Sequence, residues 1–256
     1  MEQHDMSISH SPKFYPNPGS DSVVVFIHGF MGSPRQFDWL AQAVSQQNCS
    51  AATLLLPGHG GSASDFGAGT FNSWQNHVDS EIGRLAALYK NIWLAGHSMG
   101  GLLAINAAVR FEECVRGLFT IACPFKISGF SANTLKVRLN QIFGGKGNPL
   151  KTAYLSNSSV ALSPGLLWHA QRPAAELKKL MSAARSNLGM IRVPFTAVYS
   201  TSDELTSIAS LKILKAGLNT VDFKAVVLSE SVHAFFPEHE KKIIELELLS
   251  LVAGIL

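Results

Sequence analysis

Continuous runs of apolar residues alternate along this chain with stretches in which apolar residues recur every three or four positions. The continuous runs are rich in β-branched residues and predict strands buried on both faces of a parallel sheet, at 22–27, 51–56, 91–96, 117–123, 194–200 and 222–228. The helical spacing between them predicts helices at 35–47, 73–89, 98–110 and 206–216, and a last helix that begins near Pro237. This alternation predicts an α/β fold with a mostly parallel central sheet and helices on both faces.

Three further segments carry expectations of their own. Residues 1–20 are polar and predict an irregular or short-stranded lead-in to the sheet. Residues 63–70 are mostly small and follow a glycine-rich loop, so we expect a mobile segment there. Ser73 is expected to cap the helix that follows, because a serine side chain accepts hydrogen bonds from the first free N–H groups of a helix.

The strand pattern is absent from about Phe125 to Ile191, where polar loops separate short helical stretches such as 173–184. We therefore predict a helical cap at 125–191, inserted over the strand ends of a core made of residues 1–124 and 192–256. The stretch 126–192 holds ten basic residues and one acidic residue, in a chain whose net charge is only +3. Such a cap can attract an anionic substrate or a lipid surface. We favour a solvated basic face, because long basic side chains are usually exposed.

The run at 91–96 leads into Gly96-His97-Ser98-Met99-Gly100 and continues as a helix rich in alanine and leucine. This order predicts a strand, a sharp turn and a helix, with Ser98 at the tip of the turn. Glycines two residues before and after the serine permit so tight a turn, because larger side chains would collide with the strand or the helix. A serine placed there is exposed at a helix N-terminus, whose dipole favours developing negative charge. The pentapeptide is common by chance, so Ser98 is a candidate nucleophile only if partners exist elsewhere.

Acyl transfer by a serine needs a base that takes its proton and an acid that orients the base. Asp203 directly follows the strand predicted at 194–200, and His233 lies in the loop after the last predicted strand. Because the carboxyl ends of parallel strands meet at one edge of a sheet, we expect Ser98, Asp203 and His233 to lie together there.

Other residues compete for these two roles. The rival acids are Glu204 and Asp222, and the rival bases are His239, His97 and His59. Glu204 is one residue further from the strand, and Asp222 stands at the opposite end of a strand. His239 falls in the first turn of the last helix, and the side chain of His97 is expected to point away from the base position. We therefore favour the aspartate and the histidine named above.

Backbone N–H groups are needed to bind the oxyanion that forms during acyl transfer. We expect one donor from Met99, which follows the serine, and another from Phe30, in the glycine-rich loop after the strand at 22–27. His28 in the same loop is expected to fix the loop by hydrogen bonding rather than to carry a proton.

Taken together, these motifs resemble the α/β-hydrolase superfamily, and most closely its bacterial carboxylesterase and monoacylglycerol lipase group. The residues that carry the resemblance are His28-Gly29-Phe30, Pro57-Gly58-His59-Gly60-Gly61-Ser62, Gly96-His97-Ser98-Met99-Gly100-Gly101, Asp203 and His233. The resemblance implies hydrolysis of carboxylic esters, with short or medium acyl chains or as monoacylglycerols, through an acyl-enzyme on Ser98 and without a cofactor. A thioesterase, a carbon–carbon hydrolase, a lyase or a catalytically silent ligand-binding protein on the same fold remain alternatives.

Motif content, net charge and hydropathy give no support to metal-dependent, nucleic-acid-binding or membrane-spanning functions. The chain has no His-Glu-x-x-His and no Cys-x-x-Cys motif, so we expect no metal. Its net charge gives no reason to expect nucleic acid, and its most apolar tail, 243–256, is too short to span a bilayer. We expect a cytoplasmic protein that acts on a small acyl ester, with transient contact to lipid surfaces at most. Phe125, Ile127, Phe130 and Trp168 are candidates for an acyl-chain pocket.

Overall fold

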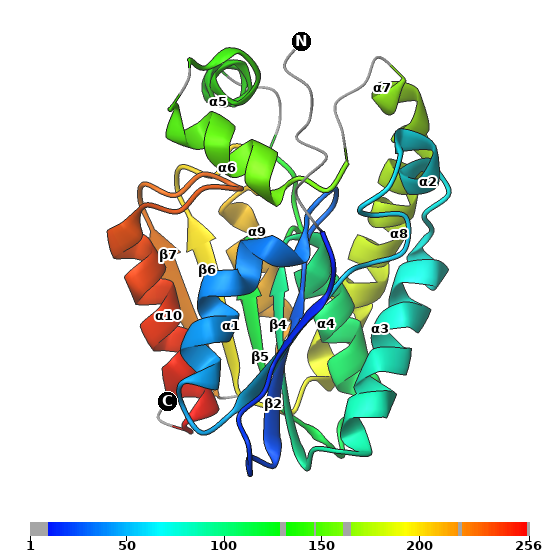
Figure 1. Cartoon of the computed structure of the whole chain (residues 1–256), viewed down its shortest axis with the longest axis vertical. Coiled ribbons are helices and arrows are strands. Elements are labelled where there is room, and N and C mark those ends of the chain that lie inside the picture. The colour runs from blue at the N-terminus through cyan, green and yellow to red at the C-terminus, as the bar shows by residue number, and fades with distance from the viewer. Residues whose placement is uncertain (1–9, 129–131, 146, 161–164, 220–221, 255–256) are drawn as a thin grey trace.

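The computed structural model describes residues 10–128, 132–145, 147–160, 165–219 and 222–254. In this part of the chain, seven strands form one sheet in the order β1-β3-β2-β4-β5-β6-β7 (Figure 1). The strands are β1 (Lys13–Tyr15), β2 (Ser22–Ile27), β3 (Ser50–Leu54), β4 (Asn91–His97), β5 (Val115–Ile121), β6 (Phe195–Ser200) and β7 (Phe223–Leu228). β1 pairs antiparallel with β3, and the remaining strands pair in parallel. The predicted mostly parallel α/β sheet is confirmed.

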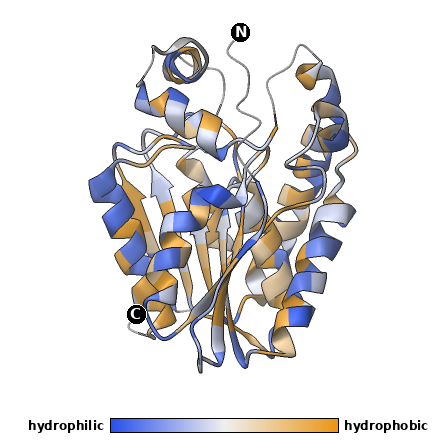
Figure 2. Cartoon of the chain, in the orientation of Figure 1, coloured by the Kyte–Doolittle hydropathy of each residue, from blue (hydrophilic) through white to orange (hydrophobic). Residues whose placement is uncertain are grey.

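Helices cover both faces of this sheet (Figure 1). They are η1 (Pro34–Phe37), α1 (Asp38–Ser45), α2 (Ala63–Gly67), α3 (Phe71–Ala86), α4 (Met99–Arg110), α5 (Ala132–Phe143), α6 (Pro149–Asn157), α7 (Leu166–His169), α8 (Gln171–Asn187), η2 (Leu188–Met190), α9 (Ala209–Gly217) and α10 (Glu238–Val252). Leu40 of α1 and Ile244 of α10 belong to the buried cluster on one face. Ile82 of α3 and Leu180 of α8 belong to the cluster on the other. Figure 2 shows hydrophilic residues on the outer sides of α3 and α10, as expected of amphipathic helices against a sheet.

The segment 63–70, expected to be mobile, contains the short helix α2. The Ser62 hydroxyl accepts the N–H of Asp65, and the Asp65 carboxylate accepts the N–H of Ser62 in return. The helix α3 likewise begins after Thr70 rather than at Ser73, because Thr70 is its cap and Ser73 completes the reciprocal pair. Both helix starts depend on a capping box, in which two side chains satisfy each other's free backbone N–H groups. The expectation of a Ser73 cap was therefore wrong.

Helices α5 and α6 lie over the carboxyl ends of the strands (Figure 1). The last helix of the segment 125–191 behaves differently, because α8 packs along α3 and α4. Leu180 and Ala184 of α8 are fully buried in that contact. Glu176 strengthens it, since its carboxylate accepts the N–H of Phe71 at 3.1 Å. α8 thus serves as the crossover helix between β5 and β6, while α5 and α6 cover the strand ends (Figure 1).

Candidate active site

The turn between β4 and α4 places Ser98 at its tip in a strained backbone conformation, with φ of 53°. The glycines beside it are required by close contacts. A Cβ on Gly100 would lie 1.9 Å from the carbonyl oxygen of Ile27, and one on Gly96 would lie 2.4 Å from the carbonyl carbon of Gly100. Only glycine permits β4, α4 and β2 to approach this closely.

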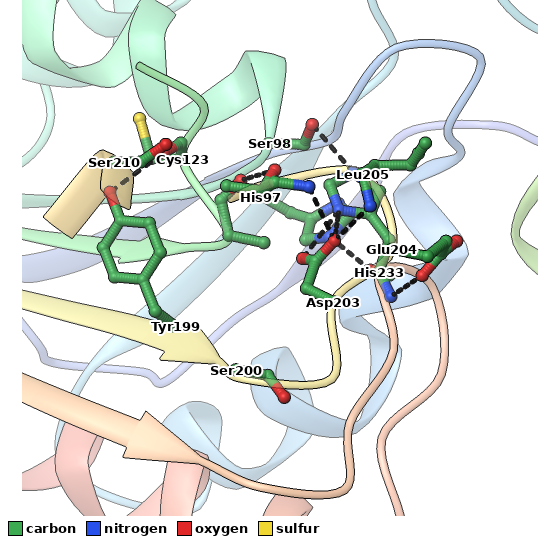
Figure 3. A network of polar contacts seen from close by, with 12 residues as sticks. His97, Ser98, Cys123, Tyr199, Ser200, Asp203, Glu204, Leu205, Ser210 and His233 are labelled. Atoms are coloured by element: carbon green, nitrogen blue, oxygen red, sulfur yellow. Dashed lines mark hydrogen bonds and ion pairs between the residues drawn. The ribbon is translucent and has the colours of Figure 1, made fainter. Parts of the chain in front are cut away.

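Three side chains from separate strand ends form a chain of hydrogen bonds (Figure 3). The Ser98 Oγ lies 3.0 Å from His233 Nε2, and His233 Nδ1 lies 2.9 Å from Asp203 Oδ2. The same carboxylate accepts the backbone N–H groups of Leu205 and Thr206 at 2.8 and 2.7 Å. Burial tends to raise the pKa of Asp203, but His233 and these two N–H groups outweigh it and lower the pKa overall. The aspartate is therefore held as an anion against the imidazole ring.

The backbone of His233 is fixed on both sides of its Cα. Its N–H donates to Glu204 Oε2 at 2.9 Å, and its carbonyl accepts from His97 Nε2 at 2.8 Å. Glu204 is 2% exposed, so this carboxylate serves the backbone inside the protein and not the imidazole ring. Sequence reasoning treated Glu204 and His97 only as rivals for the acid and the base. It missed that both hold the histidine in place.

The remaining rivals lie away from this group. The Asp222 carbonyl accepts the N–H of Phe195, which places it at the opposite end of β6. The His239 side chain is 60% exposed and faces Glu230 at 3.5 Å. The His59 ring lies edge-on to Phe66 and Trp74 beneath the site, and burial lowers its pKa to about 4.

The neighbouring histidines are neutral. Burial lowers the pKa of His97 to about 3, with a further contribution from His233. Burial also holds the pKa of His28 well below its ordinary value. Because the Leu56 N–H donates to His28 Nε2 at 3.0 Å, the His28 proton is on Nδ1, which donates to the Gly29 carbonyl at 2.9 Å. His28 thus ties the loop after β2 to the end of β3, as its predicted structural role requires.

The loop after β2 forms a tight turn in which the Gly32 N–H donates to the Gly29 carbonyl at 2.9 Å. Phe30 and Met31 occupy the middle of this turn, and Met31 has a positive φ of 58°. Within the described part of the chain, the backbone N–H groups of Phe30 and Met99 make no hydrogen bond to a backbone acceptor outside helix and strand pairing. Met99 is the first residue of α4, where such N–H groups have no partner within the helix. The loop that carries Phe30 lies against the serine, since a Cβ on Gly29 would lie 3.1 Å from the Ser98 Cβ.

The segment after α6 holds the loop that follows β2 in place through hydrogen bonds. The Ser159 N–H donates to the Met31 carbonyl at 2.9 Å, and the Ser159 hydroxyl donates to the Gly32 carbonyl at 2.5 Å. Gly32 and Ser158 also form an isolated antiparallel bridge. The covering helices and the donor loop are therefore one connected structure at this point.

A cavity of about 220 Å³ opens at Ser98, and we name it the Ser98 cavity. Its lining includes Phe30, Met31, Gln36, His97, Ser98, Pro124, Ile127, Gln141, Tyr154, Asn157, Leu177, Leu205, His233 and Ala234. Most of its surface is contributed by apolar side chains and by polar groups without charge. It is thus suited to an apolar chain next to the serine.

The residues predicted to line an acyl-chain pocket lie in different environments. Ile127 lines the Ser98 cavity. Phe125 is 7% exposed and packs into the hydrophobic core, and its backbone N–H donates to the Ser210 hydroxyl at 3.1 Å. Trp168 is 75% exposed on the short helix α7 and does not line the cavity. Phe130 lies outside the described residues.

A second buried carboxylate fixes the loop that leads to His233. Glu240 of α10 is 3% exposed and accepts the backbone N–H groups of Ser229, Glu230 and Ser231 at 2.8, 3.0 and 2.7 Å, together with the Ser231 hydroxyl. Burial opposes ionisation of Glu240, but these donors outweigh it and lower its pKa. Its sequence position, in the first turn of a helix of mixed polarity, gave no sign of this role.

The described residues contain no group of three or more histidine, cysteine, aspartate or glutamate side chains placed to hold a metal ion. In the same part of the chain, no helix combines the length and the apolar character that crossing a membrane requires. The cysteines Cys49, Cys114 and Cys123 are all buried free thiols.

Comparison with known proteins gives a family match over most of the chain. The model of the alpha/beta hydrolase family matches residues 24–239. A thermostable monoacylglycerol lipase from Bacillus sp. (strain H-257) is 24% identical over 245 residues, which is 95% of each chain. A solved structure of metagenome-derived lipolytic enzymes has a TM-score of 0.76 at 21% identity, and the match covers 96% of this chain and 98% of that one.

A different activity is named for a relative that matches over a shorter part. The 2-succinyl-6-hydroxy-2,4-cyclohexadiene-1-carboxylate synthase of Salmonella paratyphi C is 36% identical over 101 residues, which is 39% of this chain and 37% of that protein.

Proposed function

The chain belongs to the α/β-hydrolase family, as an enzyme of its esterase and lipase group, and we propose that it cleaves carboxylic esters through an acyl-enzyme on Ser98. The observation that carries this proposal is the chain of hydrogen bonds from Ser98 through His233 to Asp203, beside a mainly apolar cavity. A serine hydroxyl needs such a base and such an orienting acid to attack an ester at neutral pH.

In the first half-reaction, His233 Nε2 takes the proton of Ser98 as Oγ attacks the ester carbonyl carbon. Asp203 keeps the other ring proton on Nδ1 and stabilises the imidazolium that forms. The ring then gives its proton to the leaving alcohol, and the acyl group stays on the serine oxygen. In the second half-reaction, water gives a proton to the same nitrogen as its oxygen attacks the acyl carbon. The ring then returns this proton to Ser98 Oγ as the bond between the acyl carbon and Oγ breaks and the carboxylic acid leaves.

The N–H groups of Phe30 and Met99 serve as the oxyanion hole in both steps. Their freedom from other backbone acceptors supports this role, as does the position of Met99 at the start of α4. Preorganised donors of this kind are each worth about 10²- to 10³-fold in kcat. Because the Phe30 turn is held by Ser159, the oxyanion hole depends on the covering segment remaining in place.

The substrate class that fits is a small ester with a short or medium acyl chain, or a monoacylglycerol. A volume of about 220 Å³ and a mostly uncharged lining support an acyl chain of limited length. The free buried thiols support a reducing location, so we place the enzyme in the cytoplasm. No cofactor enters any of these steps.

A second candidate is a lyase or carbon–carbon bond hydrolase that uses the same three side chains. The observation that favours it is the 36% identity to the synthase named above. That match extends over 39% of this chain, whereas the match to the monoacylglycerol lipase extends over 95% of it. Ester hydrolysis therefore remains the function we propose.

The test is hydrolysis of p-nitrophenyl acetate, butyrate, octanoate and laurate, and of a monoacylglycerol, by the wild type and by Ser98→Ala. We expect the fastest turnover at short or medium chain length and a fall in kcat of at least about 10³-fold in the variant. Ser186→Ala is the matched control, because Ser186 is an exposed serine on α8. Wild-type inactivity on the whole panel, or full activity of Ser98→Ala, would overturn the proposal.

A further inference from the structure

A second cavity, of about 430 Å³, adjoins the Ser98 cavity, and we name it the Arg35 cavity. Four residues line both cavities, so the two cavities meet along them, and we name these residues the shared wall: Gln36, His97, Asn157 and Ala234. The other side of the Arg35 cavity is built by η1, α1, α6 and the loop before α10. A ligand in the Arg35 cavity can therefore contact residues that also line the cavity of the reacting serine.

The lining of the Arg35 cavity combines an apolar floor with positive charge. Phe37, Leu40, Ile121 and Phe236 contribute to the floor. Within the described lining, no side chain is acidic, and the charged ones are Arg35 and Lys241. Lys241 is already paired, because its Nζ lies 2.6 Å from the Glu238 carboxylate.

Arg35 is the unpaired cation of this lining. Its side chain is half-buried, and it makes no hydrogen bond or ion pair with any residue that the structure describes. A guanidinium that is partly removed from water and lacks an acceptor gains free energy when a carboxylate pairs with it. Gln36, its neighbour on the shared wall, holds a buried side-chain nitrogen that also lacks a partner among the described residues. Rotation of this amide offers a second donor without breaking a hydrogen bond.

The Ser98 cavity has the opposite character. Among its described lining residues there is no lysine and no arginine, and its one acidic residue, Glu204, is engaged with the backbone of His233. An anionic group would therefore find no counter-charge beside the serine. It would find one in the Arg35 cavity.

We propose that the Arg35 cavity binds an organic carboxylate, with the carboxylate on Arg35 and its apolar body on the floor of the cavity. This carboxylate can come from either of two sources. The first is the alcohol part of an ester substrate, and the second is a separate small acid. The first source rests on the proposed esterase function, and the second does not.

The first arm of the test compares two esters that differ in one charge, 4-butyryloxybenzoate and its methyl ester. We expect Arg35→Gln to lower the ratio of kcat/KM for the anionic ester over the neutral ester by about tenfold, the usual size of a lost charged hydrogen bond. Arg84→Gln is the matched control, because Arg84 is exposed on α3 and belongs to neither lining. Its ratio should equal that of the wild type.

The second arm measures binding of benzoate alone by tryptophan fluorescence, because Trp39 lines the Arg35 cavity. We expect a saturable change in the wild type, abolished by Trp39→Phe, and about tenfold weaker binding in Arg35→Gln. This arm needs no turnover, so it still decides the proposal if the protein hydrolyses no ester. A selective effect in the first arm assigns the carboxylate to the substrate, and an effect in the second arm alone assigns it to a separate acid. An unchanged ester ratio together with Arg35-independent benzoate binding would overturn the proposal.

Discussion

The Glu204 carboxylate accepts a hydrogen bond from the backbone N–H of His233, with 2.9 Å between Oε2 and N. The preceding residue, Asp203, accepts one from the imidazole of the same histidine at 2.9 Å. Two consecutive acidic residues after β6 thus hold two different parts of one residue. The first orients the ring and the second fixes the chain that carries it.

Glu204→Leu should therefore lower kcat by about 10- to 100-fold, the cost of an active-site group that is displaced by a fraction of an ångström. KM should change little, because Glu204 supports the base rather than the substrate. Glu204→Gln keeps an acceptor oxygen and should recover most of the activity. Steady-state kinetics on p-nitrophenyl butyrate measure both values, with exposed Glu230→Leu as the control. Equal losses in the glutamine and leucine variants would contradict a positioning role.

Asp203→Asn should lower kcat by about 10⁴-fold while leaving the fold intact. An amide at this position is held by the N–H groups of Leu205 and Thr206 through its oxygen, so its nitrogen faces the ring. The imidazole then turns its lone pair on Nδ1 to the amide and carries its proton on Nε2, where it cannot accept the serine proton. Kinetics with circular dichroism as the folding control test this, and a loss of less than tenfold would show that another group orients His233.

Gly100→Ala should prevent stable folding or lower the free energy of unfolding by more than about 3 kcal/mol. The added Cβ would lie 1.9 Å from the Ile27 carbonyl oxygen, and both segments belong to the buried core. Gly83→Ala is the matched control, because no atom lies within 4 Å of a Cβ there and its helical position favours alanine by about 1 kcal/mol. Urea denaturation of both variants gives the comparison. A Gly100→Ala protein as stable as the wild type would show that the turn is looser than described.

Glu240→Gln should lower the free energy of unfolding at pH 7 by about 3 kcal/mol, because an amide can accept fewer of the four hydrogen bonds and presents N–H to the others. The pKa of Glu240 is lowered in the folded state, so its stabilising effect is complete above its ordinary pKa of 4.5. That effect is lost as the pH falls through the lower folded-state pKa. The difference between wild type and variant should shrink over that window in acid denaturation. A difference that stays constant with pH would show that the carboxylate charge is unimportant.

The strands could be predicted from continuous apolar runs, and the turn at Ser98 from the glycines around it. Asp203 and His233, which the structure joins to Ser98, could be predicted because each lies in the loop that follows a strand. The sequence was insufficient where a contact joins distant segments. Nothing local marks Ser159 as a partner of Gly32, or Glu240 as the anchor of a loop nine to eleven residues before it.

Apolar side chains in the covering segment illustrate the same limit. Phe125, Ile127 and Trp168 all carry large, mainly hydrocarbon side chains, but one packs in the core, one lines the cavity and one is exposed. Their positions follow from the path of the chain after β5 and from the packing of α7, which no periodicity encodes. The capping box of α2 differs from these cases, because Ser62 and Asp65 lie three residues apart and form a signal that is local in the sequence.

The most direct test of the central claim is identification of the residue that carries the acyl group. Wild-type protein is mixed with p-nitrophenyl butyrate, quenched in acid and digested, and its peptides are analysed by mass spectrometry beside a sample labelled with a fluorophosphonate. We predict butyryl and phosphonyl groups on Ser98, a burst of p-nitrophenol equal to the enzyme concentration when deacylation is the slower step, and no labelling in Ser98→Ala. Steady hydrolysis of the ester with Ser98 unmodified in both samples would contradict the account.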